Sequence, residues 1–125
     1  MLVLDAGALI AVDRGDREMW RRLKAELLAE ESPVTHGAIV GQVWRKSGGR
    51  QARLAAVLEG LEVVPLDLSL GRAAGELLAK ADQTDVIDAA LVLLTRDGDQ
   101  LLTSDPDDLE GLAQAARRNI DLIKV

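Results

Sequence analysis

Four aspartates in this sequence have the spacing and the neighbours that a metal-dependent site needs. Asp5 ends an apolar segment, Leu2–Leu4, that predicts a short buried strand. Asp105 ends another such segment, and Asp85 and Asp88 stand three residues apart on one face of an expected helix start. In open α/β sheets, the loops that follow the strands meet at one edge and bind ligands there. Carboxylate oxygens are hard ligands, which favour Mg²⁺ or Mn²⁺.

Each of these acids also has a purely structural interpretation, because aspartate is a common N-cap of helices. Asp88 fits that interpretation least, since the residues around it in 86–92 are apolar. A buried carboxylate without a partner costs several kcal/mol, so Asp88 needs a cation, a hydrogen-bond donor or a metal. Converging carboxylates repel one another unless a divalent ion lies among them. We therefore expect Asp5, Asp85, Asp88 and Asp105 to bind a metal and to be catalytic.

Such a cluster supports phosphoryl transfer to water. A divalent ion lowers the pKa of a bound water and stabilises the oxygens of an in-line displacement. No protein nucleophile is then required, which suits a chain with no cysteine and no evident pairing of a serine with its one histidine.

The elements that must position these acids alternate between strand and helix, which predicts an α/β fold with a mostly parallel sheet covered on both faces. The expected strands are 2–4, 34–36, 61–66, 100–103 and 120–125, and Pro65 is expected to interrupt or end the third. The expected helices are 8–12, 16–30, 37–46, 51–58, 70–81, 86–94 and one that begins at Pro106. If the strand order reverses beside the first strand, the first and fourth strands are neighbours, and Asp5 lies near Asp105.

Length and composition predict a single globular domain over residues 1–125 with an aliphatic core. Apolar residues make up 48% of the chain, which contains no Phe and no Tyr. Without cysteine there is no disulfide framework, no thiolate nucleophile and no Cys-ligated zinc. No signal peptide precedes the first strand, and no apolar run approaches the ~18 residues of a membrane span. We therefore expect a cytoplasmic protein that does not enter a membrane.

Four segments, in this order along the chain, resemble the PIN domain: a first strand followed by LDAGALIA, a helix ending in QVWR, a helix start DVIDAALV, and a strand ending in LLTSDPDDL. More narrowly, almost the whole chain resembles the VapC-type ribonuclease toxins of bacterial toxin–antitoxin pairs. The resemblance implies a PIN-like three-layer α/β/α fold with about five strands, and a cluster of acids that binds Mg²⁺ or Mn²⁺ and cleaves RNA. It also implies an inhibitory antitoxin partner and a homodimer.

The resemblance assigns roles to individual acids. The first acid of the family pattern matches Asp5 and the last matches Asp105, with Asp107 or Asp108 as helpers. Asp88 suits the middle position better by its neighbours and its distance to the last acid. Asp85, one helical turn earlier, is kept as an alternative or additional ligand.

Gln42 departs from the family pattern, which implies a glutamate at this position. Glutamine can accept a hydrogen bond from a metal-bound water, but it carries no charge and is a poor general base. Gln42 is therefore a candidate catalytic residue with altered chemistry, and Asp85 is a candidate to supply the missing charge.

Charge indicates where RNA or a partner would bind. The net charge of −6 argues mildly against a nucleic-acid binder, but cationic residues cluster in two segments of the chain. We expect four of them to contact RNA phosphates or, alternatively, an acidic or amphipathic antitoxin segment that lies in a groove. These residues are Arg14, Arg17, Arg45 and Arg50.

Other conspicuous side chains receive mainly structural predictions. Trp20 recurs with leucines at helical spacing and is expected in the core. Trp44 is expected to pack, in preference to stacking on RNA bases. His36 is expected to be a satisfied polar group at a strand end, in preference to a contact with substrate phosphate. Gly7 and Ala8 are expected to leave room beside Asp5 for a hydrated ion and a phosphate.

Two alternatives compete with a nuclease. A module that binds RNA or an antitoxin, with weak or no cleavage, is favoured by Gln42. A phosphoryl-accepting receiver domain or a related phosphatase also places an aspartate after its first strand. The phosphatase pattern needs a further acid where Gly7 stands, and the receiver pattern needs a lysine beyond the last expected strand, within which Lys124 lies.

Overall fold

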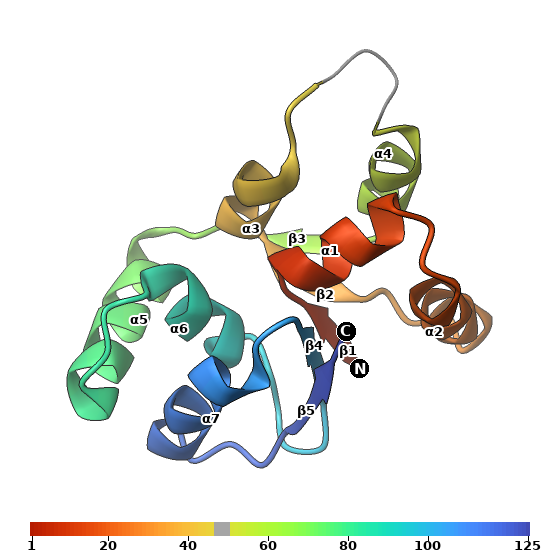
Figure 1. Ribbon diagram of the computed structural model, residues 1–125. Coiled ribbons are helices and arrows are strands. Elements are labelled where there is room, and N and C mark those ends of the chain that lie inside the picture. The colour runs from red at the N-terminus through yellow and green to blue at the C-terminus, as the bar shows by residue number, and fades with distance from the viewer. Residues whose placement is uncertain (47–50) are drawn as a thin grey trace.

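A parallel sheet organises the computed structural model, which describes residues 1–46 and 51–125 (Figure 1). In the described residues the strands are β1 Leu2–Leu4, β2 Val34–His36, β3 Glu62–Val64, β4 Gln100–Thr103 and β5 Asp121–Lys124. Their order across the sheet is β3-β2-β1-β4-β5, and every neighbouring pair is parallel. The strand order reverses between β1 and β4, which meets the condition under which the first and fourth strands were expected to be neighbours.

Helices cover both faces of this sheet. Along the described chain they are α1 Ala6–Asp13, α2 Arg17–Leu28, α3 Gly37–Val43, α4 Ala52–Glu59, α5 Leu68–Ala81, α6 Val86–Leu93 and α7 Pro106–Ala115. Figure 1 shows α5, α6 and α7 gathered on one side of the sheet, and α1, α2 and α4 on the other. The predicted three-layer α/β/α architecture is confirmed.

The core lies on both sides of β1. Leu2, Val3 and Leu4 are all buried, because a central parallel strand has helices on each face and therefore needs apolar residues at every position. Leu4 is paired with Leu102 of β4, whose side chain is also buried. The edge strands β3 and β5 are more exposed than β1. Their sequences accordingly combine charged and apolar residues.

Aspartate N-caps set where several helices begin. Oδ1 of Asp16 accepts a hydrogen bond from the amide of Met19 at 2.9 Å, and Oδ1 of Asp67 accepts one from the amide of Leu70 at 2.9 Å. Each bond satisfies an amide that has no partner within its own helix. The helix start after Asp16 was predicted, and Asp67 rather than Ser69 caps α5.

Two predictions in the middle of the chain are wrong. The helix expected to reach Lys46 ends at Val43, where the Gln51 side chain donates to the carbonyl of Val43 and accepts from the amide of Lys46. Side-chain bonds of this kind compete with continued helix. Trp44 is consequently extended and 38% exposed, so it does not pack in the core.

The third strand ends at Val64, directly before the proline that was expected to interrupt or end it. Pro65 has no amide hydrogen to donate to a neighbouring strand. Within the described residues, no helix combines the length and the apolar character needed to cross a membrane.

Candidate acidic site

Asp5 lies at the carboxyl end of β1, where the strand order reverses. Its amide donates to the carbonyl of Leu102 at 3.1 Å, which fixes the residue against β4. Oδ1 accepts a hydrogen bond from the amide of Ala8 at 2.9 Å, so Asp5 is the N-cap of α1. No described residue donates to Oδ2. The cap therefore occupies one oxygen of a carboxylate that is 9% exposed and leaves the other available.

The first turn of α6 brings two more acids to this edge. Asp85 is the N-cap of α6, and its Oδ1 accepts from the amides of Ile87 at 3.0 Å and Asp88 at 3.1 Å. Asp88 follows one turn later and is half-buried, which agrees with the apolar character of its neighbours. Asp85 is exposed.

Electrostatics show that the predicted acids are neighbours of Asp88. Burial, followed by the charges of Asp85, Asp5, Asp108 and Asp105 in that order, raises the pKa of Asp88 from 3.8 to about 6. Like charges disfavour an additional negative charge nearby. The other three acids predicted from the sequence, together with Asp108, therefore act on Asp88.

Asp105 and Asp108 interact directly at the start of α7. Asp105 occupies the N-cap position, but its side chain makes no capping bond within the described chain. Instead a hydrogen bond with Asp105, and the charge of Asp105, raise the pKa of the exposed Asp108. The amide of Asp105 donates to Oγ1 of Thr103 at 3.0 Å, which holds the turn. Asp108, one of two helpers implied by the family pattern, thus lies beside Asp105.

The carboxylates are neighbours, but they are not arranged around a single point as the ligands of one metal ion would be. Among residues 1–46 and 51–125, no three Asp, Glu, His or Cys side chains are arranged as they would be around one bound ion. Mutual repulsion keeps carboxylates apart when no cation is among them. Mg²⁺ usually keeps several waters and contacts one or two carboxylates, so a loose set of acids fits this ion better than ions that need a compact set of protein ligands.

The space expected beside Gly7 is filled. A Cβ on Gly7 would lie 2.6 Å from both Cβ and Oγ of Ser104 and 3.0 Å from its amide nitrogen. Gly7 therefore allows α1 to approach the turn after β4, rather than leaving room for a phosphate. The exposed residue Ser104 lies beside Gly7, and the sequence reasoning missed it because only the approach of two distant segments identifies it.

The other predicted site residues that the structure describes lie on or just after α3 and around the junction of α1 and α2. Gln42 is exposed in the last turn of α3. Arg14 follows the end of α1 opposite to Asp5, and Arg17 begins α2; both are exposed. Nη1 of Arg45 donates to the carbonyls of Gly41 and Trp44 at 2.9 and 2.7 Å. Arg50 lies outside the described residues.

His36 is completely buried at the end of β2. Its Nε2 is 2.9 Å from the carbonyl oxygen of Ile87, and burial lowers the pKa of the ring. The predicted structural role is confirmed for Nε2, although no described group bonds to Nδ1. A side chain with no exposed surface does not contact a phosphate of the substrate.

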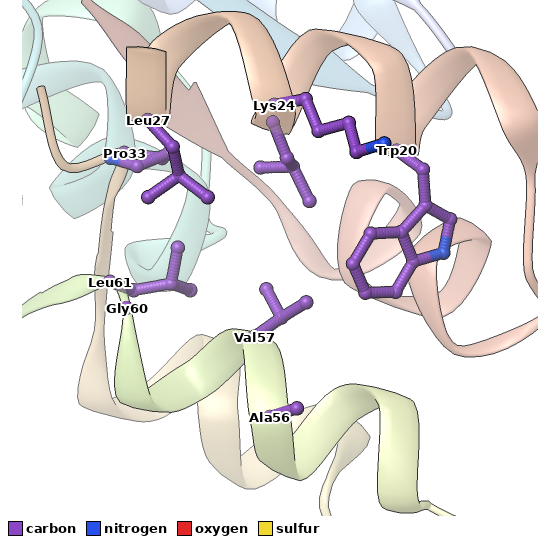
Figure 2. A pocket seen from close by; sticks show the side chains of 9 residues that line it. Trp20, Lys24, Leu27, Pro33, Ala56, Val57, Gly60 and Leu61 are labelled. Atoms are coloured by element: carbon purple, nitrogen blue, oxygen red, sulfur yellow. The ribbon is translucent and has the colours of Figure 1, made fainter. Parts of the chain in front are cut away.

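An apolar groove lies between α2 and α4, on the layer of helices that also contains α1. It encloses about 260 Å³ and is lined by Trp20, Leu23, Lys24, Leu27, Pro33, Ala56, Val57, Gly60 and Leu61. Figure 2 shows Leu27, Val57 and Leu61 pointing toward one another, with the Trp20 ring at one end. Trp20 packs against the core, as predicted, and its Nε1 donates to the carbonyl of Val12 at 3.2 Å.

The strand order excludes a receiver-like fold. Receiver domains order their strands 2-1-3-4-5, whereas this sheet is ordered β3-β2-β1-β4-β5. Lys124 is an exposed residue within the edge strand β5, paired with Thr103 of β4.

Comparison with known proteins identifies the fold. No protein-family model matches the chain, and no curated protein matches its sequence. Among solved structures, it is similar to a chain in the crystal structure of VapBC2 from Rickettsia felis bound to a DNA fragment from their promoter. The TM-score is 0.69 at 14% sequence identity, over 97% of this chain and 97% of that chain. With the motifs and the strand order described above, this similarity establishes that the chain has a PIN-like fold.

Proposed function

We propose that this chain is a Mg²⁺- or Mn²⁺-dependent endoribonuclease and the toxin of a toxin–antitoxin pair. The observation that carries the proposal is the raised pKa of Asp88, to which Asp5, Asp85, Asp105 and Asp108 all contribute. A fold gains nothing in stability from gathering acids at one sheet edge, but a divalent cation binds where negative charges converge. The PIN-like fold and its similarity to a VapBC2 chain support the same function.

The acids have different parts in this proposal. When bound, the ion would activate a water for in-line attack on phosphorus and offset the charge of the phosphate. Asp5, whose Oδ1 is held by the amide of Ala8, would hold the ion with its other carboxylate oxygen. Asp88 would lose its proton if the ion bound, because a nearby cation would offset the burial and the repulsion that raise its pKa. Asp85 and Asp105 add negative charge near Asp88.

The substrate in this proposal is RNA, bound across the carboxyl edge of the sheet. Helix α1 has eight residues and is about 12 Å long, so Arg14 and Arg17 at its far end would contact phosphates distant from the cleaved bond. Such contacts position a nucleic acid without selecting a sequence. Arg45 is fixed by backbone carbonyls in the same layer of helices and would serve the same purpose.

The antitoxin in this proposal covers the apolar groove with an amphipathic helix that carries acidic residues. Helix α2 forms one wall and has four cationic and two acidic side chains (4 − 2 = +2), although the whole chain carries −6. Lys24 lines the groove and is exposed, so it is placed to pair with an acid of the partner. Leu27 is 62% exposed at the rim, where an apolar side chain of the partner would cover it.

Cleavage of total RNA by the purified chain tests the proposed activity. We expect cleavage with Mg²⁺ or Mn²⁺, loss of cleavage in EDTA, and recovery when excess metal is added. RNA that is bound but not cut would contradict the nuclease and support the binding module that Gln42 favours.

Matched substitutions at two adjacent leucines test the partner surface, by co-purification with the product of a neighbouring short gene. Leu27→Asp is expected to abolish binding, because it places a charge in the apolar groove. Leu28→Asp is the control, since Leu28 is 87% exposed and does not line the groove. Equal binding by both variants would contradict the proposal for this surface.

A further inference from the structure

We propose that His36 is a positioning residue of the acidic site, which holds the first turn of α6 so that Asp88 stays beside Asp5. This inference rests on the proposed function and adds to it a residue outside the acid cluster. The contact that carries it joins the last residue of β2 to the second residue of α6.

The ring of His36 fixes the peptide group next to Asp88. Nε2 lies 2.9 Å from the carbonyl oxygen of Ile87, while the amide of Ile87 is held by Oδ1 of Asp85 at 3.0 Å. The Ile87 residue is therefore anchored from two directions, by the sheet and by the helix cap. Asp88 follows it directly, so its position is set by these two bonds.

The protonation of the ring follows from its partner. A carbonyl oxygen can accept but cannot donate, so Nε2 carries the hydrogen. Nδ1 is buried and no described group bonds to it, which agrees with a neutral ring and with the lowered pKa of His36. His36 is thus a neutral donor of one directional bond within the apolar interior.

Packing alone does not explain a histidine at this position. A buried polar nitrogen without a partner destabilises the fold, whereas an aliphatic side chain would fill the position without this cost. The gain from histidine is the bond to α6. That bond opposes the repulsion between Asp88 and the acids around it, which acts to move the start of α6 away from the sheet.

Two substitutions of His36 test this inference in the full-length chain. His36→Leu removes the donor and keeps an apolar filling, and His36→Gln keeps an amide donor at a similar reach. Partners that orient metal ligands typically contribute 10- to 100-fold to metal affinity, so we expect His36→Leu to bind Mn²⁺ about tenfold more weakly. His36→Gln should recover most of that affinity. Mn²⁺ binding is measured by calorimetry, alongside RNA cleavage and thermal unfolding in EDTA.

Thr95→Val is the control for a general loss of stability. Thr95 is buried after the other end of α6, where its hydroxyl donates to the carbonyl of Val92 at 2.5 Å. Thr95→Val should lower the melting temperature and leave the affinity for Mn²⁺ unchanged. Equal Mn²⁺ affinity in wild type and His36→Leu, or no recovery in His36→Gln, would overturn the role of His36. A wild-type chain that cleaves no RNA with Mn²⁺ would instead overturn the proposed function.

Discussion

The charge of Asp5, at the end of β1, raises the pKa of Asp88, which belongs to a helix in the layer with α5 and α7. The two carboxylates therefore lie close enough to interact electrostatically at the carboxyl edge of the sheet. Oδ1 of Asp5 is held by the amide of Ala8 and the amide of Asp88 is held by Asp85, so neither acid is free to withdraw fully from the other. Each of the following predictions tests one part of this arrangement.

Asp88→Asn is expected to stabilise the metal-free chain at pH 8. The folded pKa of about 6 exceeds the usual 3.8, so between these values the folded chain holds a proton that the unfolded chain has lost. The free energy of unfolding of the wild type therefore falls as the pH rises from about 4 to about 6, and stays lower above that range. Asparagine does not titrate, so the free energy of unfolding of Asp88→Asn does not fall in this way. We expect a gain of about 1 kcal/mol, reduced by solvent screening of the half-buried group.

Urea denaturation in EDTA at pH 5 and pH 8 measures this effect. The gain should be larger at pH 8, and added Mg²⁺ should stabilise the wild type more than the variant. Equal free energies of unfolding for the two chains at pH 8 would contradict the electrostatic account of Asp88.

Gly7→Ala is expected to destabilise the fold by about 1–3 kcal/mol, because the new Cβ would lie 2.6 Å from the side chain of Ser104. Gly71→Ala in α5 is the matched control, since no described atom outside its own helix and its chain neighbours lies within 4 Å of a Cβ there. That control should stabilise the chain by about 0.5–1 kcal/mol. A neutral Gly7→Ala variant, measured by urea denaturation, would show that α1 and the turn after β4 separate easily.

Two substitutions at Asp85 separate its cap from its charge. Asparagine is as good an N-cap as aspartate, so Asp85→Asn should keep the stability of the chain, whereas Asp85→Ala should lose about 1 kcal/mol. Both variants should bind Mn²⁺ more weakly if Asp85 supplies the charge that Gln42 lacks. Unchanged Mn²⁺ binding and cleavage in Asp85→Asn would leave Asp85 with the role of a cap alone.

Gln42→Glu is expected to tighten Mn²⁺ binding severalfold and to increase the rate of RNA cleavage, because it adds a negative charge at the position where the family pattern has one. Gln42 is exposed, so the change should alter thermal stability little. Gln42→Ala serves as the control for loss of the amide. If Gln42→Glu matched the wild type in both metal binding and cleavage, residue 42 would lie outside the site.

The sequence predicted the parts of this molecule that depend on local pattern. The apolar run of β1 and the i, i+3 spacing of Asp85 and Asp88 are visible in the chain itself, and parallel topology then brings Asp5 to Asp105. Contacts between segments that are distant in the chain could not be predicted from the sequence. Ser104 fills the space beside Gly7, and the bond from His36 to Ile87 joins residues whose numbers differ by 51. The early end of α3 likewise depends on bonds from Gln51 across a turn.

The most direct test of the acidic site is the rate of RNA cleavage as Mn²⁺ is added to the wild type and to Asp5→Asn. Asparagine preserves the N-cap of α1 and removes one negative charge and one ligand oxygen, so the two chains should unfold at similar urea concentrations in EDTA. We predict saturable, Mn²⁺-dependent cleavage by the wild type and loss of at least ~100-fold in rate for the variant, as expected when a metal ligand of this kind is removed. Cleavage by Asp5→Asn at the wild-type rate, or wild-type cleavage that persists in EDTA, would contradict a metal site built on Asp5 and Asp88.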